Sequence, residues 1–189
     1  MSLMTKLFSK GWIVTFSALA LPLCGERSPP ASPASHSMEQ LIVPHLEWAV
    51  TQEQKGWGLM GRRKLPWDEG MLFFMDKEPG LLWSFNCWID LDVACFDQQG
   101  VLLKVLPLFA YPEKMDPRRP VTSLSDLSLY PMGDPIRHFF IEQAVRPPPA
   151  TRYLIEMNLG WFAAHQLHEK AQLFFPGGSN QVALVRLAP

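Results

Sequence analysis

The stretch from Met71 to Leu108 decides the fold, and it reads MLFFMDKEPGLLWSFNCWIDLDVACFDQQGVLLKVLPL. Apolar runs of strand length recur along it, at 71–75, 81–85, 92–96 and 101–108. The last two runs are separated by the polar residues DQQG at 97–100, which are typical of a four-residue hairpin connection. The pattern therefore predicts consecutive antiparallel strands that enclose one core.

Short elements are expected on both sides of this stretch. Thr51 and Gln54 have the spacing of a capping box, so a short helix is predicted over residues 52–59. Asn158 can cap a second short helix at 160–166. Further strands are predicted at 152–157, 171–175 and 181–187. Together these elements predict a mainly β (α+β) domain, a compact antiparallel barrel or sandwich with one or two short helices.

Proline is the unusual feature of the composition. The chain has 189 residues and 18 prolines, about twice the ordinary usage of roughly 5%. Because an interior proline breaks a helix, this count argues against a long helical bundle and favours loop-rich or β-rich structure. Eight of the prolines fall within residues 109–150. We interpret this segment as an insertion with one short strand at 138–144, either a lid over a pocket or a surface excursion.

The N-terminal residues 1–23 have the pattern of a signal peptide. Lys6 and Lys10 precede an uncharged run at 11–23, which is shorter than the roughly 20 apolar residues of a membrane-spanning helix. Residues 24–38 are rich in Pro, Ala and Ser and predict an extended tether, and residues 39–189 are expected to form a single β-rich domain. The predicted location is the periplasm or a membrane-anchored position at the cell envelope.

Cys24 follows the apolar run directly, in the sequence LPLCGE. This sequence resembles the lipobox of bacterial lipoproteins, in which the cysteine becomes the lipidated first residue of the mature chain. Leu21 fits the lipobox, whereas Pro22 and Leu23 depart from it. A lipid on Cys24 would make the membrane a partner of the protein. The alternative is ordinary cleavage within residues 18–20, ALA.

The charge balance and the motifs exclude several partners. Lys and Arg number 17 and Asp and Glu number 18, so the net charge of −1 does not supply the basic field that binds nucleic acid. The sequence has no phosphate loop, dinucleotide fingerprint or zinc spacing, so no cofactor and no metal are predicted. Cys87 and Cys95 either form a disulfide in an oxidising compartment or stay as free buried thiols.

Three ordered blocks resemble the family called domain of unknown function 192. The first, within residues 46–73, contains GLM, an arginine, LP and DEGMLF, similar to the family pattern GLM-x-R and LP-x-D-x-GMLF. The second is LWSFN at 82–86 followed by LD at 91–92, similar to FWMKN-x-x-x-x-LD. The third, YLIEMN at 153–158 and the glycine and tryptophan after it, is similar to VLE-x-x-x-G. Apart from the insertion, the resemblance covers about residues 46–187.

The resemblance implies a compact β-rich domain of envelope or extracytoplasmic proteins. It implies no established activity, substrate or cofactor, and it transfers no catalytic residue. Phe85 stands where the family usually has lysine, and Asp90 stands where it usually has proline. These departures put in question any function that depends on the lysine charge.

The candidate ligand-binding residues are polar groups that interrupt apolar runs, with one tryptophan that can stack on a sugar: Arg62, Asp68, Trp83, Asn86 and Asp92. Asp90 and Asp92 have period-two spacing, which places both on one strand face, where they can bind a hard cation or act as an acid/base pair. Arg62 can hold a ligand carboxylate. Alternatively, Arg62 pairs with Asp68 or Asp92 inside the fold, Asn86 holds a turn and Trp83 packs in the core.

Three functions follow from these observations. The first is a non-enzymatic binding or accessory domain at the envelope, for a small molecule, a saccharide or an envelope protein. The second is a hydrolase-type enzyme that uses Arg62, Asp90 and Asp92. The third is a structural envelope component. No catalytic residue is assigned, because no nucleophile and base occur in a recognisable order.

Overall fold

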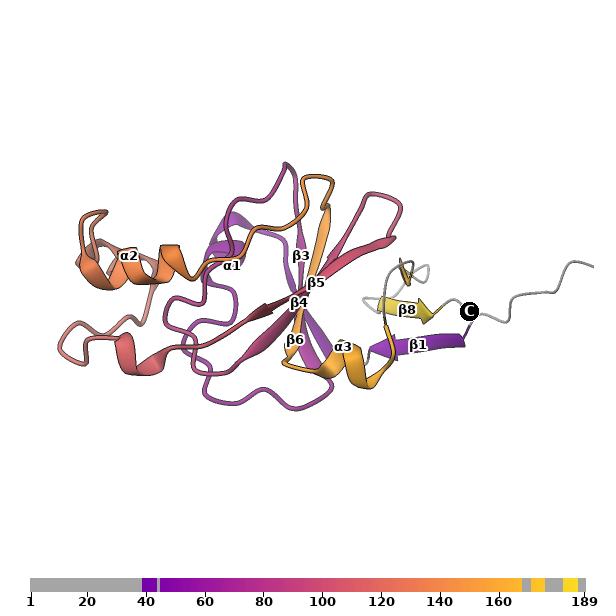
Figure 1. Ribbon diagram of the computed structural model, residues 1–189, viewed down its shortest axis with the longest axis horizontal. Coiled ribbons are helices and arrows are strands. Elements are labelled where there is room, and N and C mark those ends of the chain that lie inside the picture. The colour runs from indigo at the N-terminus through magenta and orange to yellow at the C-terminus, as the bar shows by residue number, and fades with distance from the viewer. Residues whose placement is uncertain (1–38, 44, 168–170, 176–181, 187–189) are drawn as a thin grey trace, which may run out of the picture. The chain divides into compact units, whose positions relative to one another are not determined.

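The computed structural model describes residues 39–43, 45–167, 171–175 and 182–186. A five-stranded sheet forms the centre of this domain, in the order β2-β3-β6-β4-β5 (Figure 1). Its strands are His45–Ala49 (β2), Glu69–Phe74 (β3), Leu91–Phe96 (β4), Leu102–Leu108 (β5) and Tyr153–Asn158 (β6). A three-stranded antiparallel sheet has the order β1-β8-β7, with Glu39–Val43 (β1), Gln172–Phe174 (β7) and Val182–Arg186 (β8).

The predicted fold class, a β-rich α+β domain with few short helices, is confirmed. The barrel within that prediction does not form. The five-stranded sheet is open, since β2 and β5 are its two edges. One strand pair, β2 with β3, is parallel, and the other pairs of this sheet are antiparallel.

The strand order also differs from the predicted succession of antiparallel neighbours. β4 and β5 form the predicted hairpin, and the amide of Asp97 donates to the carbonyl of Val101 at 3.0 Å across it. β3 and β4 do not pair, because β6 lies between them and is antiparallel to both. Apolar runs predict where strands are, but a strand's partner need not be its neighbour in sequence.

Gly70 on β3 accounts for part of this arrangement. A Cβ at this position would overlap the backbone carbonyl of Glu156 and the sulfur of Met157, both on β6. Glycine is therefore needed for the two strands to approach so closely. The glycine of the DEGMLF block serves the pairing of β3 with β6.

Helix α1 (Gln52–Trp57) begins at the predicted capping box. The Thr51 hydroxyl accepts a hydrogen bond from the amide of Gln54 at 3.1 Å, and the Gln54 side chain accepts one from the amide of Thr51 at 2.9 Å. Gly58 ends the helix with a φ of +54°, a left-handed value that favours glycine. Gly58, the first residue of the GLM block, therefore serves to end helix α1.

Helix α3 (Trp161–Ala164) begins after Gly160 and not at Asn158, so the predicted cap is wrong. The Asn158 amide instead donates to the carbonyls of Leu65 and Pro66, at 3.1 and 2.9 Å. It joins β6 to the loop that precedes β3. Asparagine suits either role, and only the position of the neighbouring loop decides between them.

Two predicted strands do not form. Residues 81–85 make a single isolated bridge, between Leu82 and Val145, and Phe85 is fully buried in a side-chain cluster. The strand predicted at 138–144 is wrong because most of it belongs to helix α2 (Pro135–Glu142). Asp134 caps that helix and a proline follows it at the first helical position, a strong start signal.

The segment at 109–150 contains α2 and two short 3-10 helices, η1 (Pro112–Lys114) and η2 (Leu124–Leu129). Its side chains form a core cluster with Met60 and Phe85, to which it contributes Val121, Tyr130 and Phe140. The segment is therefore attached to the domain by buried apolar contacts and not only by its two ends.

The two faces of the five-stranded sheet carry separate cores. One face, with Leu72 and Ile155, packs against α3 and against Leu184 of β8. The other, with Phe73 and Leu154, packs against Leu59, just after α1. Figure 1 accordingly shows α1 and α2 on one side of the sheet and α3 on the other.

Several predictions concern the cysteines and the N-terminal residues. Cys87 and Cys95 are free and buried, so the two do not form a disulfide. The predicted signal peptide at 1–23, Cys24 and the tether at 24–38 lie outside the described residues. In the part of the chain that the structure describes, no helix combines the length and the apolar character needed to cross a bilayer.

Candidate functional site

A pocket of about 180 Å³ lies on the face of the sheet that carries Phe73 and Leu154. Strands β3, β5 and β6 line it from one side, and α1 and residues 81–87 line it from the other. Most of its lining is apolar or aromatic, including Trp57, Phe73, Met75, Leu82, Trp83 and Leu154. Its three ionisable side chains are Lys55, Cys87 and Glu156. We call it the Glu156 pocket.

Glu156 is the unusual residue of this pocket. It lies in the middle of β6, the central strand of the sheet, and its cross-strand neighbours are the buried Met71 and Val93. Because strand side chains alternate, Glu156 points to the same face as Leu154. Among the described residues, none donates a hydrogen bond to its carboxylate or forms an ion pair with it. A partly buried carboxylate without a partner is costly to keep in a fold.

This burial sets the protonation of the pocket. Burial raises the pKa of the Glu156 carboxyl from 4.5 to about 7, because a charge is disfavoured where few water molecules reach it. Burial, together with the nearby negative charge of Glu156, raises the pKa of the Cys87 thiol to about 12. The carboxyl therefore titrates near neutral pH, while the thiol keeps its proton.

Lys55 does not neutralise Glu156. Its ammonium group donates to the carboxylate of Asp76 at 2.8 Å, and Asp76 is exposed and outside the pocket lining. Lys55 itself is mostly buried, with 10% of its side chain exposed. Among the described lining residues, the pocket thus holds one carboxylate and no cation directed at it.

One of the five predicted ligand-binding residues, Trp83, lines this pocket. Its ring stacks on Phe85 with the ring centres 5.0 Å apart, and the guanidinium of Arg137 lies 5.6 Å from the centre of the Trp83 ring. Both neighbours fix the orientation of the indole. Trp83 therefore packs in a cluster, as one of the sequence alternatives has it, and also borders this cavity.

Asp68 and Asp92 lie together at a different place, the start of α3. Asp92 accepts a hydrogen bond from the amide of Gly160 at 2.8 Å, and Asp68 accepts one from the indole nitrogen of Trp161 at 3.1 Å. Burial raises the pKa of Asp92, and the bond from Gly160 lowers it in part. Both carboxylates are thus occupied in holding the turn between β6 and α3.

Arg62 is not brought together with Asp90 or Asp92. Its guanidinium pairs with Glu47 on the edge strand β2, and not with Asp68 or Asp92, the partners that the sequence offered inside the fold. Asp90 precedes β4 and accepts a hydrogen bond from the amide of Ala110 at 2.8 Å. Because Asp90 lies outside the strand, period-two alternation does not apply to the pair that it forms with Asp92.

Asn86 occupies a turn, as one of the sequence alternatives has it. Its backbone φ is +54°, and its side-chain amide donates to the carbonyl of Val121 at 3.0 Å. It thereby ties the 109–150 segment to the domain. Asn86 also borders a groove of about 640 Å³, which we call the Arg63 groove, lined in addition by Arg63, Trp88, Met115 and Arg119.

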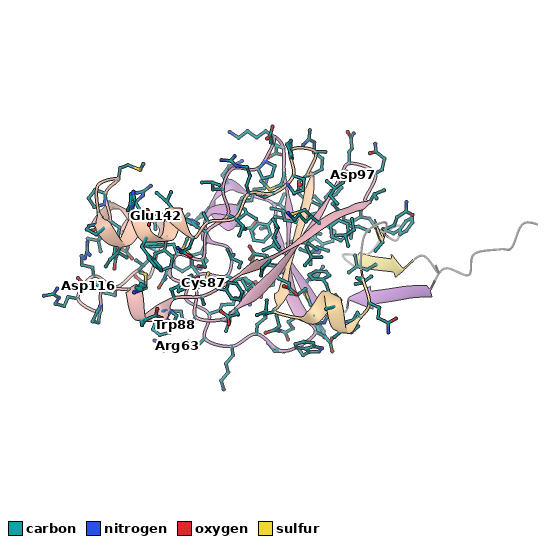
Figure 2. All side chains as sticks on the ribbon, in the orientation of Figure 1. Arg63, Cys87, Trp88, Asp97, Asp116 and Glu142 are labelled. Carbon is teal, nitrogen blue, oxygen red and sulfur yellow. The ribbon has the colours of Figure 1, made fainter. Side chains whose placement is uncertain are left out.

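In the Arg63 groove, the Arg63 guanidinium stacks on the ring of Trp88, 3.8 Å from its centre, and Figure 2 shows the two side by side. Arg119 on the same groove is bonded to Asp116 and Asp134. In the described part of the chain, no group of three His, Cys, Asp or Glu residues is placed to hold a metal ion.

Sequence reasoning missed Glu156 as a site residue. The signal was present, since Glu156 lies two positions after the apolar Leu154, and therefore on the same face, in a strand that the sequence predicted. A charge at that position is ordinary on an edge strand. It becomes unusual only once β6 is known to be the central strand.

These features define a small α+β domain with an open mixed sheet and a pocket on one face. The chain belongs to the DUF192 family, described as uncharacterized ACR, whose model matches residues 34–175. The predicted family assignment is therefore confirmed. The name of the family states no activity.

Solved structures to which this chain is similar include two bacterial proteins. One is a candidate transcription regulator from Sinorhizobium meliloti 1021, with 18% identity and a TM-score of 0.43 over 75% of this chain and 95% of that one. The other is a protein of unknown function from Novosphingobium aromaticivorans DSM 12444, with 18% identity and a TM-score of 0.48 over 79% of this chain and 94% of that one. No curated protein matches the chain.

Proposed function

We propose that this protein is an exported, non-catalytic binding domain that takes a small molecule into the Glu156 pocket. The observation that carries the proposal is the Glu156 carboxylate, which lies among apolar walls without a partner in the described structure. Polar groups in a fold are usually satisfied within it. A carboxylate without a protein partner on a pocket wall is a group with which a ligand can pair.

The pocket has the composition of a ligand site. Small-molecule sites are concave and mostly apolar, with a few polar groups that orient the ligand. An apolar cavity of about 150 Å³ is enough to bind benzene, and this pocket measures about 180 Å³. The ligand proposed is therefore a molecule little larger than a benzene ring, with an apolar body and one polar group.

The location at the cell envelope is proposed from the sequence. The charged n-region, the uncharged run at 11–23 and Cys24 support export and attachment through a lipid, with residues 24–38 as the tether. Metabolic labelling with a palmitate analogue tests the anchor. We expect label on the natural chain and none on Cys24→Ala, and an unlabelled natural chain would disprove the lipid.

The other two functions have less support. A hydrolase-type enzyme would need Arg62, Asp90 and Asp92 at one place, whereas each is bonded to a different partner. A purely structural role at the envelope does not explain why a carboxylate without a partner lies in an apolar pocket. An oligosaccharide or an envelope protein as the ligand would be too large for the Glu156 pocket, at about 180 Å³, to enclose.

A comparison of two methionine variants tests the binding function. Met75→Trp fills the pocket, since Met75 is part of its lining. Met132→Trp is the matched control, because Met132 is 71% exposed and outside the pocket. We expect small aromatic probes to raise the melting temperature of the full-length natural chain and of Met132→Trp, but not of Met75→Trp. Equal responses in all three would place the binding elsewhere.

A further inference from the structure

The charge of the Glu156 pocket restricts its ligand. Besides Glu156, the ionisable side chains that line the pocket are Lys55 on α1 and Cys87 in the loop that precedes β4. Cys95 on β4 belongs to the core of the same sheet face. Lys55 is bonded to Asp76, and both thiols keep their protons because burial raises their pKa values. None of them supplies a positive charge to Glu156.

We infer that the ligand of the Glu156 pocket is an organic amine whose ammonium group pairs with the Glu156 carboxylate, an inference that rests on the proposed binding function. The ammonium donates hydrogen bonds to a carboxylate that has no donor within the described structure. Its positive charge also replaces the counter-ion that the pocket lacks. Above about pH 7, where Glu156 is ionised, a carboxylate or phosphate ligand would instead be repelled.

The walls of the pocket suit the same class of ligand. The rings of Phe73, Trp57 and Trp83 line it, and aromatic rings attract a cation that approaches their faces. They also bury an apolar body. A pocket of about 180 Å³ accommodates a benzene ring with one short substituent. Benzylamine, which is one aminomethyl group larger than benzene, has both required parts and serves as the probe.

The inference has a definite dependence on pH. The amine stays protonated up to a pH well above neutrality, so the ionisation of Glu156, whose pKa is raised to about 7, controls the pairing. The affinity for benzylamine is expected to rise by at least about tenfold between pH 5.5 and pH 8. Benzyl alcohol has the same shape and no charge, so its affinity is not expected to rise over that interval.

Isothermal titration of the full-length chain with benzylamine, benzyl alcohol and toluene tests the inference. At pH 8 we expect benzylamine to bind at least about tenfold more tightly than either neutral probe. Glu156→Gln is expected to remove this preference while it still binds toluene, which shows that the pocket is intact. Glu142→Gln is the matched control, because Glu142 is an exposed carboxylate on α2, and it is expected to bind benzylamine as the natural chain does.

The titrations distinguish failure of the amine inference from failure of the proposed binding function. If the neutral probes bind as tightly as benzylamine, or if Glu156→Gln keeps the preference for the amine, the amine inference is wrong and the pocket remains a binding site. If none of the three probes binds the natural chain, the proposed binding function fails, and the amine inference fails with it.

Discussion

The carboxylate of Asp92 on β4 accepts a hydrogen bond of 2.8 Å from the backbone amide of Gly160, which precedes helix α3. Asp68, before β3, accepts a second bond from the indole of Trp161. Two acids far apart in sequence thus fix one short helix against the sheet. This helix buries Trp161 and Phe162 in the core of its face. The LD and DEGMLF blocks therefore meet the third block at this turn.

The bond between Asp92 and Gly160 predicts a loss of stability in Asp92→Ala. The variant leaves a partly buried amide without an acceptor, which costs about 1–3 kcal/mol of the free energy of unfolding. Asp90→Ala is the control, because Asp90 accepts its bond from the amide of Ala110 in an exposed setting, and a cost below about 1 kcal/mol is expected. Urea unfolding monitored by tryptophan fluorescence measures both. Equal costs would mean that the turn is held by other contacts.

The pKa of Glu156 predicts how stability depends on pH. The folded chain keeps this proton up to about pH 7, while the unfolded chain releases it near pH 4.5, so raising the pH between these values favours unfolding. Relative to Glu156→Gln, the natural chain is expected to lose on the order of 3 kcal/mol of unfolding free energy over this interval. Urea titrations of both chains at several pH values measure the difference. Parallel curves would show that Glu156 has no raised pKa.

The close approach of β3 and β6 predicts that Gly70 does not tolerate a side chain. Gly70→Ala places a methyl group against the Glu156 carbonyl, and the overlap is expected to cost about 2–3 kcal/mol of unfolding free energy. Gly80→Ala is the control, because a Cβ there meets no atom within 4 Å. Its effect should stay within about 0.5 kcal/mol. Thermal or urea unfolding of the two variants gives the comparison, and a silent Gly70→Ala would contradict the β3–β6 register.

The buried thiols predict slow alkylation of the folded chain. Burial raises the pKa of Cys87 to about 12 and that of Cys95 to about 11, so very little thiolate is present at pH 8. In a Cys24→Ala background, iodoacetamide should leave the native chain unlabelled and label both cysteines in urea without a reductant. Mass spectrometry counts the labels. A chain that takes up label in urea only after reduction would contain the disulfide that the structure lacks.

Local signals determined the elements that depend on near neighbours in the chain. The capping box at Thr51 and the hairpin at 97–100 formed as predicted, because each needs only residues a few positions apart. The three family blocks identified the family. By contrast, the apolar residues at 81–85 and 138–144 were assigned to strands that do not form, since an apolar run shows that side chains are buried and not which backbone conformation buries them.

The sequence by itself determined the fold class, the family and most of the strands, because alternation and turn residues act locally. Only the tertiary structure decided which strands are neighbours. Because β6 lies between β3 and β4, the Glu156 side chain faces apolar walls. If β6 were an edge strand, the same side chain would be exposed to water. The free energy of a charge depends on what surrounds it, and for Glu156 those surroundings come from strands distant in sequence.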